Sequence, residues 1–195
     1  MDFIGSKDYW DEKYTNRSDN PLNPEASLVE NISCFKNGSV LDIACGDGRN
    51  TLFLLENKFK VLGIDYSEIA LNRLKLFAEK NHYFVDIKQI DLSIANALED
   101  IGIFDNILIN HYKLSGEQLA DIKNHISDGG ILFICGFGYK HVVDSKIKKE
   151  DLIQTADFVE VKKSFVLIKY AESQDDRGFF VTYIFRKKKV NAIIL

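Results

Sequence analysis

The chain has 195 residues, of which 46% are hydrophobic, and its formal net charge is -4. This size and apolar content are enough to bury one full hydrophobic core, so a single domain over 1–195 is expected. An acidic chain has no general attraction for a polyanion, so nucleic acid is not expected as a partner. No apolar run approaches the roughly 18–20 residues of a membrane span, and the charged first ten residues do not form a secretory signal. We therefore expect no membrane association.

The cysteines indicate a reducing compartment. Their number is odd, and Cys45 and Cys135 lie inside apolar, strand-like runs, so no disulfide framework is expected. We therefore expect the protein in the cytoplasm. The chain contains no CxxC or HExxH motif and no close His/Cys cluster, so no metal site is expected.

Five apolar runs in the middle of the chain have the character of buried strands. They are rich in Ile, Val, Leu and Phe and alternate little with polar residues, which is typical of parallel strands covered on both faces. The expected strands are Ser39–Ala44, Lys60–Asp65, Phe84–Asp91, Phe104–Asn110 and Gly130–Phe137.

Amphipathic segments fit between these strands. Helices are expected over Asn50–Asn57 and from Ser67 to about Lys80. Ser115 and Gln118 have the spacing of a capping box, which predicts a helix from there to Ile126. This alternation of strand and helix predicts a doubly wound α/β sheet.

The C-terminal part has a different pattern. Two long β-prone runs, Phe158–Tyr170 and Phe179–Lys188, are separated by the turn-forming residues AESQDDRG. They predict an antiparallel hairpin, which makes the sheet a seven-stranded, mostly parallel one of the Rossmann-like type.

A glycine turn follows the first strand. Gly46 and Gly48 allow a ligand to approach the backbone closely, and the helix that follows presents free N–H groups. Asp65 ends the second strand, where an acid can bind a ribose. A nicotinamide dinucleotide is disfavoured, because the GxGxxG pattern fails at Thr51.

The ordered motifs resemble the class I S-adenosylmethionine-dependent methyltransferases. The first motif is an acid followed by small residues, with Ala44 where many members have glycine. The order of YWDEKY, NPLNPEA and LDIACGDGRN is similar to the small-molecule branch that includes tellurite-resistance and thiopurine methyltransferases. The motif residues are Asp42, Ala44, Gly46 and Gly48, then Asp65, Asp91 and the strand Phe104–Asn110.

The resemblance implies S-adenosyl-L-methionine as cofactor and a helical cover over its site from residues 1–36. It implies that Asp42 reaches the cofactor's ammonium group, Asp65 the ribose hydroxyls and Asp91 the adenine amine. The cofactor-binding residues that it implies are Asp42, Ala44, Gly46, Gly48, Asn50, Asp65, Tyr66, Asp91, Leu92, Asn110 and Trp10.

The expected reaction is in-line methyl transfer to a small molecule with a thiol, oxyanion or hydroxyl nucleophile. His111 and Tyr112, just after the fourth strand, are the expected catalytic residues, because an imidazole can accept a proton near neutral pH. The fourth strand ends in NHYK rather than in an NPPY-type motif, which disfavours nucleic-acid base modification. A monomer or a homodimer is expected.

Other interpretations stay open. For Asp42 the alternative role is that of a strand-end acid, and for Asp91 it is that of an N-cap. For His111 the alternative is a pocket-lining residue, and for Trp10 it is a residue with only a packing role. The cofactor-binding role is best supported for Asp65, because a carboxylate at the end of a buried strand has a desolvation cost and no evident partner in the sequence. A non-catalytic S-adenosylmethionine-binding protein would have the same motifs.

Overall fold

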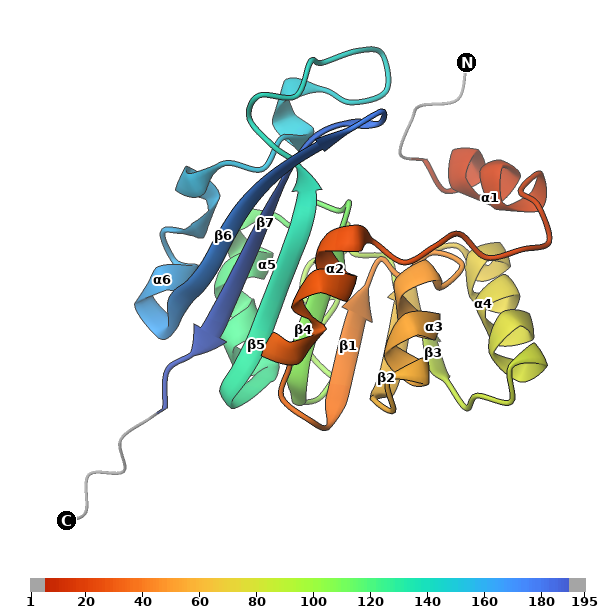
Figure 1. Ribbon diagram of the computed structural model, residues 1–195, viewed down its shortest axis with the longest axis horizontal. Helices are drawn as coiled ribbons and strands as arrows, with labels where there is room; N and C mark the ends of the chain where they lie inside the picture. The colour runs from red at the N-terminus through yellow and green to blue at the C-terminus, as the bar shows by residue number, and fades with distance from the viewer. Residues whose placement is uncertain (1–5, 190–195) are drawn as a thin grey trace. The chain divides into compact units, whose positions relative to one another are not determined.

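The computed structural model describes residues 6–189. Within them, seven strands form one sheet in the order β3-β2-β1-β4-β5-β7-β6 (Figure 1). The β1–β2, β2–β3 and β4–β5 pairs are parallel, and β7 is antiparallel to both β5 and β6. The strands are β1 (Ser39–Ile43), β2 (Lys60–Asp65), β3 (Asp86–Gln89), β4 (Phe104–Asn110), β5 (Ile126–Phe137), β6 (Phe165–Asp175) and β7 (Gly178–Lys187). The predicted mostly parallel sheet with an antiparallel C-terminal hairpin is confirmed.

Helices occupy most of the segments between the strands. The α-helices are α1 (Lys7–Thr15), α2 (Ala26–Asn31), α3 (Arg49–Glu56), α4 (Glu68–Lys80), α5 (Gly116–Asp121) and α6 (Val161–Ser164). Short 3-10 helices are η1 (Ile32–Cys34), η2 (Ile122–Asn124), η3 (Lys149–Asp151) and η4 (Thr155–Phe158).

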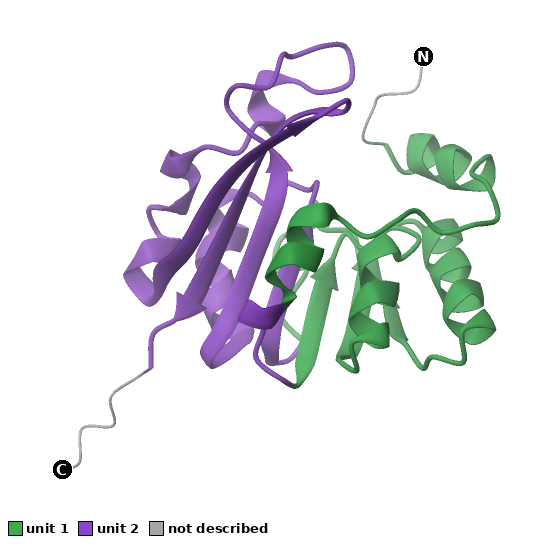
Figure 2. Cartoon of the chain, viewed as in Figure 1, with its two compact units in different colours: residues 1–32, 38–100 green, residues 33–37, 101–195 purple. Residues whose placement is uncertain are grey.

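The chain divides into two compact units (Figure 2). Unit 1 comprises residues 1–32 and 38–100, and unit 2 comprises residues 33–37 and 101–195. The expectation of one domain over 1–195 stays a prediction, and each unit is described by itself below.

In unit 1, the strands β1 and β2 are almost entirely buried, and α4 packs on β2 and β3. The apolar face of α4 presents Leu71 and Leu74 to Cys45, which is 8% exposed and acts as a small core residue. Ser67 is the N-cap of α4, because its Oγ accepts a hydrogen bond from the backbone N–H of Ala70 at 3.2 Å. The helix therefore begins where the sequence predicts it.

In unit 2, the core lies among aromatic side chains of the hairpin and the segment before it. Phe158 packs against Tyr183 with ring centroids 4.5 Å apart and against Phe185 at 5.1 Å. Each of these three side chains is 2% exposed or less. The aromatic residues thus hold η4 against β7.

Several predicted boundaries are wrong in both units. The predicted capping box at Ser115 is present, but α5 ends at Asp121 and β5 begins at Ile126. His125 lies between them and is held by Gly102 O at 3.2 Å and the Asp121 carboxylate at 3.0 Å, which ends the helix there. In unit 1, β3 is shorter than predicted and covers only Asp86–Gln89.

The first strand of the hairpin also begins later than predicted. Residues 158–164 are helical or turn rather than extended, and β6 starts at Phe165. The buried residues Phe158, Val161 and Phe165 recur at helical rather than alternating spacing, which explains the difference. At the other end, β6 continues through most of AESQDDRG to Asp175, which pairs with Gly178 across a tight turn.

Candidate functional site

The glycine turn between β1 and α3 has an unusual backbone. Ala44, Gly46 and Gly48 have φ angles of +55°, +56° and +89°. This left-handed region costs an L-residue about 1–2 kcal/mol, so Ala44 carries strain that glycine would not. A Cβ atom on Gly46 would overlap the Tyr14 hydroxyl, and one on Gly48 would overlap the side chain of Leu74. Both glycines are therefore needed for backbone angle and for space.

Asp65 closes this turn from the end of β2. Its side chain accepts hydrogen bonds from the backbone N–H groups of Gly46 and Ser67, each at 2.9 Å. Burial raises the pKa of this carboxyl group, and the backbone hydrogen bonds oppose the increase. No partner for Asp65 is evident from the sequence, whereas the structure shows two, so part of its role is to brace the turn. Its expected ribose contact stays a prediction.

Asp42 lies deeper in unit 1 and is 1% exposed. Thr51 Oγ1 donates a hydrogen bond of 2.6 Å to its carboxylate. Burial raises the pKa of Asp42 to about 7; the Thr51 bond lowers it and the charge of Asp65 raises it further. Neither Asp42 nor Asp65 forms a salt bridge within residues 6–189, so two buried acids lie beside the turn without a protein cation.

Helix α1 lies against this region and packs on α4. Tyr14 in its last turn is 8% exposed, and Trp10 stacks on the Tyr14 ring with centroids 5.9 Å apart. Lys13 Nζ lies 4.1 Å from the centroid of the Trp10 ring. Trp10 therefore has packing partners in the protein, and its expected contact with the cofactor stays a prediction.

A buried ion-pair cluster joins the segment after α1 to the glycine turn. Asp47, whose side chain is 2% exposed, accepts from Arg17 at 2.7 Å and from Arg73 at 3.4 Å. At the other end of α1, the Tyr66 hydroxyl donates to the backbone oxygen of the N-cap Ser6 at 2.9 Å. Neither Asp47 nor Tyr14 is among the site residues predicted from the sequence. The available signals were an acid between the two glycines and an aromatic residue at helical spacing from Trp10.

Three other residues predicted to bind the cofactor differ in burial and in hydrogen bonding. Asn50 is 3% exposed, and its Oδ1 accepts from the Glu25 backbone N–H at 2.9 Å, which holds the start of α2. Asp91 is exposed, and its Oδ1 accepts from the backbone and the hydroxyl of Ser93, which lowers its pKa. Leu92 beside it is 8% exposed. Asp91 thus caps a turn, as the alternative interpretation expects, and its adenine contact stays a prediction.

In unit 2, the two expected catalytic residues, His111 and Tyr112, directly follow β4, and Asn110 is the last residue of that strand. Asn110 Oδ1 is a buried oxygen with no hydrogen-bond partner among the described residues. His111 has a φ of +54° and is exposed. Its ring centroid lies 5.4 Å from that of Phe137 and 5.3 Å from that of Phe180. His141 contacts the same Phe137 ring at 4.3 Å. These side chains form an aromatic cluster with two imidazoles.

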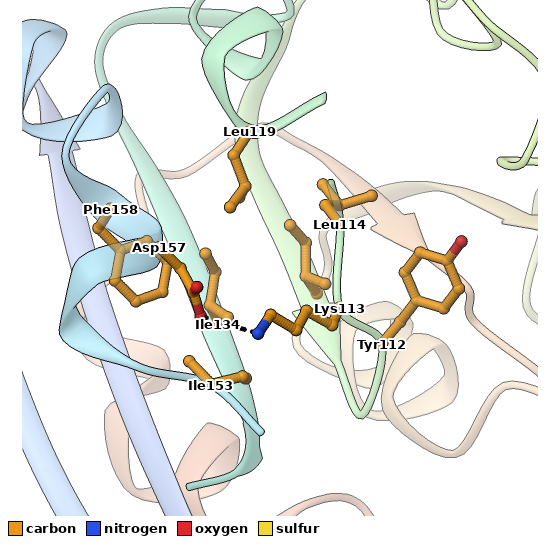
Figure 3. A pocket seen from close by; sticks show the side chains of 9 residues that line it. Tyr112, Lys113, Leu114, Leu119, Ile134, Ile153, Asp157 and Phe158 are labelled. Carbon is orange, nitrogen blue, oxygen red and sulfur yellow. Dashed lines mark ion pairs between the residues drawn. The ribbon is translucent and has the colours of Figure 1, made fainter. Parts of the chain in front are cut away.

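A small hollow lies beside this segment (Figure 3). The two charged side chains that line it pair with each other, since Lys113 Nζ lies 3.3 Å from the Asp157 carboxylate. Lys113 Nζ also donates to Leu152 O at 2.8 Å. Tyr112 lies at its edge with the hydroxyl pointing away from the hollow (Figure 3). The lining residues are Ile109, Tyr112, Lys113, Leu114, Leu119, Ile134, Ile153, Asp157 and Phe158. The hollow is mostly apolar and brings no reactive groups together.

Three further features bear on function. Among the helices of residues 6–189, none has the length and apolar character to cross a membrane. In the same part of the chain, no group of His, Cys, Asp and Glu side chains is arranged to hold a metal ion. All three cysteines are free thiols.

Comparison with known proteins gives clear relatives. The family model described as tellurite resistance protein TehB matches residues 3–175. The probable S-adenosyl-L-methionine-dependent methyltransferase TehB of Haemophilus influenzae is 25% identical over 132 residues, which cover 66% of this chain and 44% of the relative. The ribosomal protein L11 methyltransferase of Thermosipho africanus is 31% identical over 112 residues, 55% of this chain and 39% of that protein. The chain thus spans less than half the length of these curated relatives.

Solved structures agree on the fold. TehB from Haemophilus influenzae superposes with a TM-score of 0.68 at 21% identity, covering 93% of this chain and 67% of that one. The N-methyltransferase NodS from Bradyrhizobium japonicum, in complex with S-adenosyl-L-homocysteine, gives 0.69 at 15% identity, covering 94% and 99%. These likenesses show a class I methyltransferase fold of the Rossmann-like type. With the family model matching residues 3–175, the chain belongs to the TehB family of class I methyltransferases, which use S-adenosyl-L-methionine as cofactor.

Proposed function

We propose that this chain transfers the methyl group of S-adenosyl-L-methionine to a small-molecule acceptor with a thiol, oxyanion or hydroxyl nucleophile. The observation that carries the proposal is the Asp65 carboxylate, which is held beside the left-handed glycine turn by Gly46 and Ser67. A fixed carboxylate can accept two hydrogen bonds from a diol, and bonds to a charged acceptor are about twice as strong as neutral ones.

The surroundings of the turn fit this cofactor. Buried Asp42 and Asp65 have no salt bridge within the described residues, and a ligand with ammonium and sulfonium groups would compensate their charges. The space and backbone angles at Gly46 and Gly48 allow close approach of a ligand to the main chain.

The reaction asks little proton chemistry of the protein. When bound, the cofactor supplies a methyl group on a sulfonium, and the leaving group is a neutral thioether. The chain's own residues therefore act mainly by binding, orienting the nucleophile about 3–3.5 Å from the methyl carbon and excluding water. We propose His111 as the base where the nucleophile must lose a proton, with Tyr112 as its neighbour in acceptor binding.

We further propose that the protein acts in the cytoplasm, as a monomer or a homodimer, without nucleic acid as partner. The three free thiols support a reducing compartment, and the net charge of -4 disfavours a polyanion.

The test measures both binding and turnover. The protein is titrated with S-adenosyl-L-methionine in a calorimeter, and release of S-adenosyl-L-homocysteine is then followed with a panel of thiols, oxyanions and phenols. Turnover with one acceptor class supports the proposal and names the class. Binding without turnover across the panel would favour the non-catalytic alternative.

One matched pair of variants tests the cofactor site. Asp65→Ala is expected to weaken cofactor binding roughly tenfold to a hundredfold, the scale of a hydrogen bond to a charged group. Asp86→Ala removes an exposed acid at the start of β3 and is expected to leave the affinity unchanged. Unchanged affinity in Asp65→Ala would mean that the ribose is held elsewhere.

A further inference from the structure

Tyr14 has a mostly buried side chain whose hydroxyl group forms no hydrogen bond within residues 6–189. The side chain is 8% exposed, and the hydroxyl lies against Gly46, where a Cβ atom would overlap it. Tyrosine hydroxyls on mostly buried rings usually have a hydrogen-bond partner, so a ligand at the glycine turn would supply the one that the protein does not.

The packing of Tyr14 does not require the hydroxyl. The contacts of its side chain are made by the ring, which stacks on Trp10 and has the Arg17 guanidinium 5.0 Å from its centroid. A phenylalanine would make both ring contacts. The hydroxyl is therefore available for a ligand.

The charges around this hydroxyl keep its proton in place. Burial and the nearby carboxylates of Asp65 and Asp47 raise the pKa of Tyr14, so that the group is a donor at any working pH. Those carboxylates already accept hydrogen bonds from other groups: Asp47 from two arginines, and Asp65 from Gly46 and Ser67. The hydroxyl thus lies at the glycine turn, and it has no hydrogen-bond acceptor among the described residues.

We infer that Tyr14 is a cofactor-binding residue whose hydroxyl donates a hydrogen bond to the α-carboxylate of the cofactor's amino-acid end. This inference rests on the proposed function and adds a specific residue to it. An α-amino acid brings one cation and one anion to the turn. The buried acid Asp42 suits the ammonium group, and the retained proton of Tyr14 suits the carboxylate.

The experiment compares two ligands on the full chain. S-adenosyl-L-homocysteine has the amino-acid end, whereas 5′-methylthioadenosine has the adenosine and the thioether without it. In calorimetry, Tyr14→Phe is expected to lower the affinity for the first about tenfold or more and to leave the affinity for the second unchanged. The Tm of the unliganded variant is expected to equal or exceed that of the wild type, because no hydrogen bond of the folded protein is lost.

Tyr9→Phe is the matched control, since Tyr9 lies on the same helix and its ring also contacts Trp10, at 5.5 Å. It is expected to change neither affinity. Unchanged binding of S-adenosyl-L-homocysteine by Tyr14→Phe would overturn the inference, as would an equal loss for both ligands, which indicates a structural role. If the wild type binds the cofactor and turns over while Tyr14→Phe binds equally well, the inference fails and the proposed function stands.

Discussion

Removing the charge of Asp42 is expected to stabilise the unliganded protein at high pH. Asp42 is 1% exposed, and burial raises its pKa from 3.8 to about 7. The folded state therefore binds this proton more tightly than the unfolded state, so the contribution of Asp42 to stability is largest below pH 4 and is lost as the pH rises through 7. At about 1.4 kcal/mol per pKa unit, the loss over the whole window is about 4 kcal/mol, of which about 3 kcal/mol falls between pH 5 and pH 8.

The assay is urea unfolding of wild type and Asp42→Asn at pH 5, 6, 7 and 8. Asparagine keeps an oxygen that can accept from Thr51, whose hydroxyl lies 2.6 Å from the Asp42 carboxylate. Other groups titrate in both proteins, so the difference between the two curves isolates Asp42. The variant is expected to gain about 3 kcal/mol relative to the wild type from pH 5 to pH 8. Parallel curves would refute the reasoning, because they would mean that Asp42 is ionised without penalty in the fold.

Two further predictions concern the glycine turn and its ion-pair cluster. Gly48→Ala and Gly102→Ala both place a methyl group at positive φ, but a Cβ atom meets Leu74 at the first site and nothing within 4 Å at the second. In urea unfolding, Gly102→Ala should lose about 1–2 kcal/mol and Gly48→Ala about 1–3 kcal/mol more; equal losses would contradict the packing argument. Asp47→Asn breaks the ion pairs of a buried carboxylate and should cost about 3 kcal/mol, with faster proteolytic cleavage near residues 16–24; an unchanged cleavage rate would show that the cluster does not hold this segment.

Local patterns in the sequence were enough for most of the fold. The runs Lys60–Asp65 and Phe104–Asn110 coincide with β2 and β4, because strands buried on both faces read as uninterrupted apolar segments. The capping box at Ser115 and the N-cap Ser67 are also local, since each side chain bonds to a backbone group three residues away. The strand-to-helix boundary therefore located the glycine turn and the acid Asp65 from sequence alone.

The predictions that failed depended on contacts between distant residues. Residues 158–164 have β-prone composition, but they are not extended because Phe158 packs on Tyr183 and Phe185 of β7. Tertiary packing outweighs intrinsic strand preference, which is a weak and context-dependent term.

Contacts between distant residues also account for the features of the candidate site that the sequence does not predict. Sequence alone determined that the chain is an α/β protein with a glycine turn flanked by Asp42 and Asp65. Only the tertiary structure decided that Tyr14 lies on Gly46 and that Arg17 pairs with Asp47, 30 residues away. Spacing along the chain reports the helix or strand period of one segment, whereas such contacts arise when segments far apart fold together and bury the same surface.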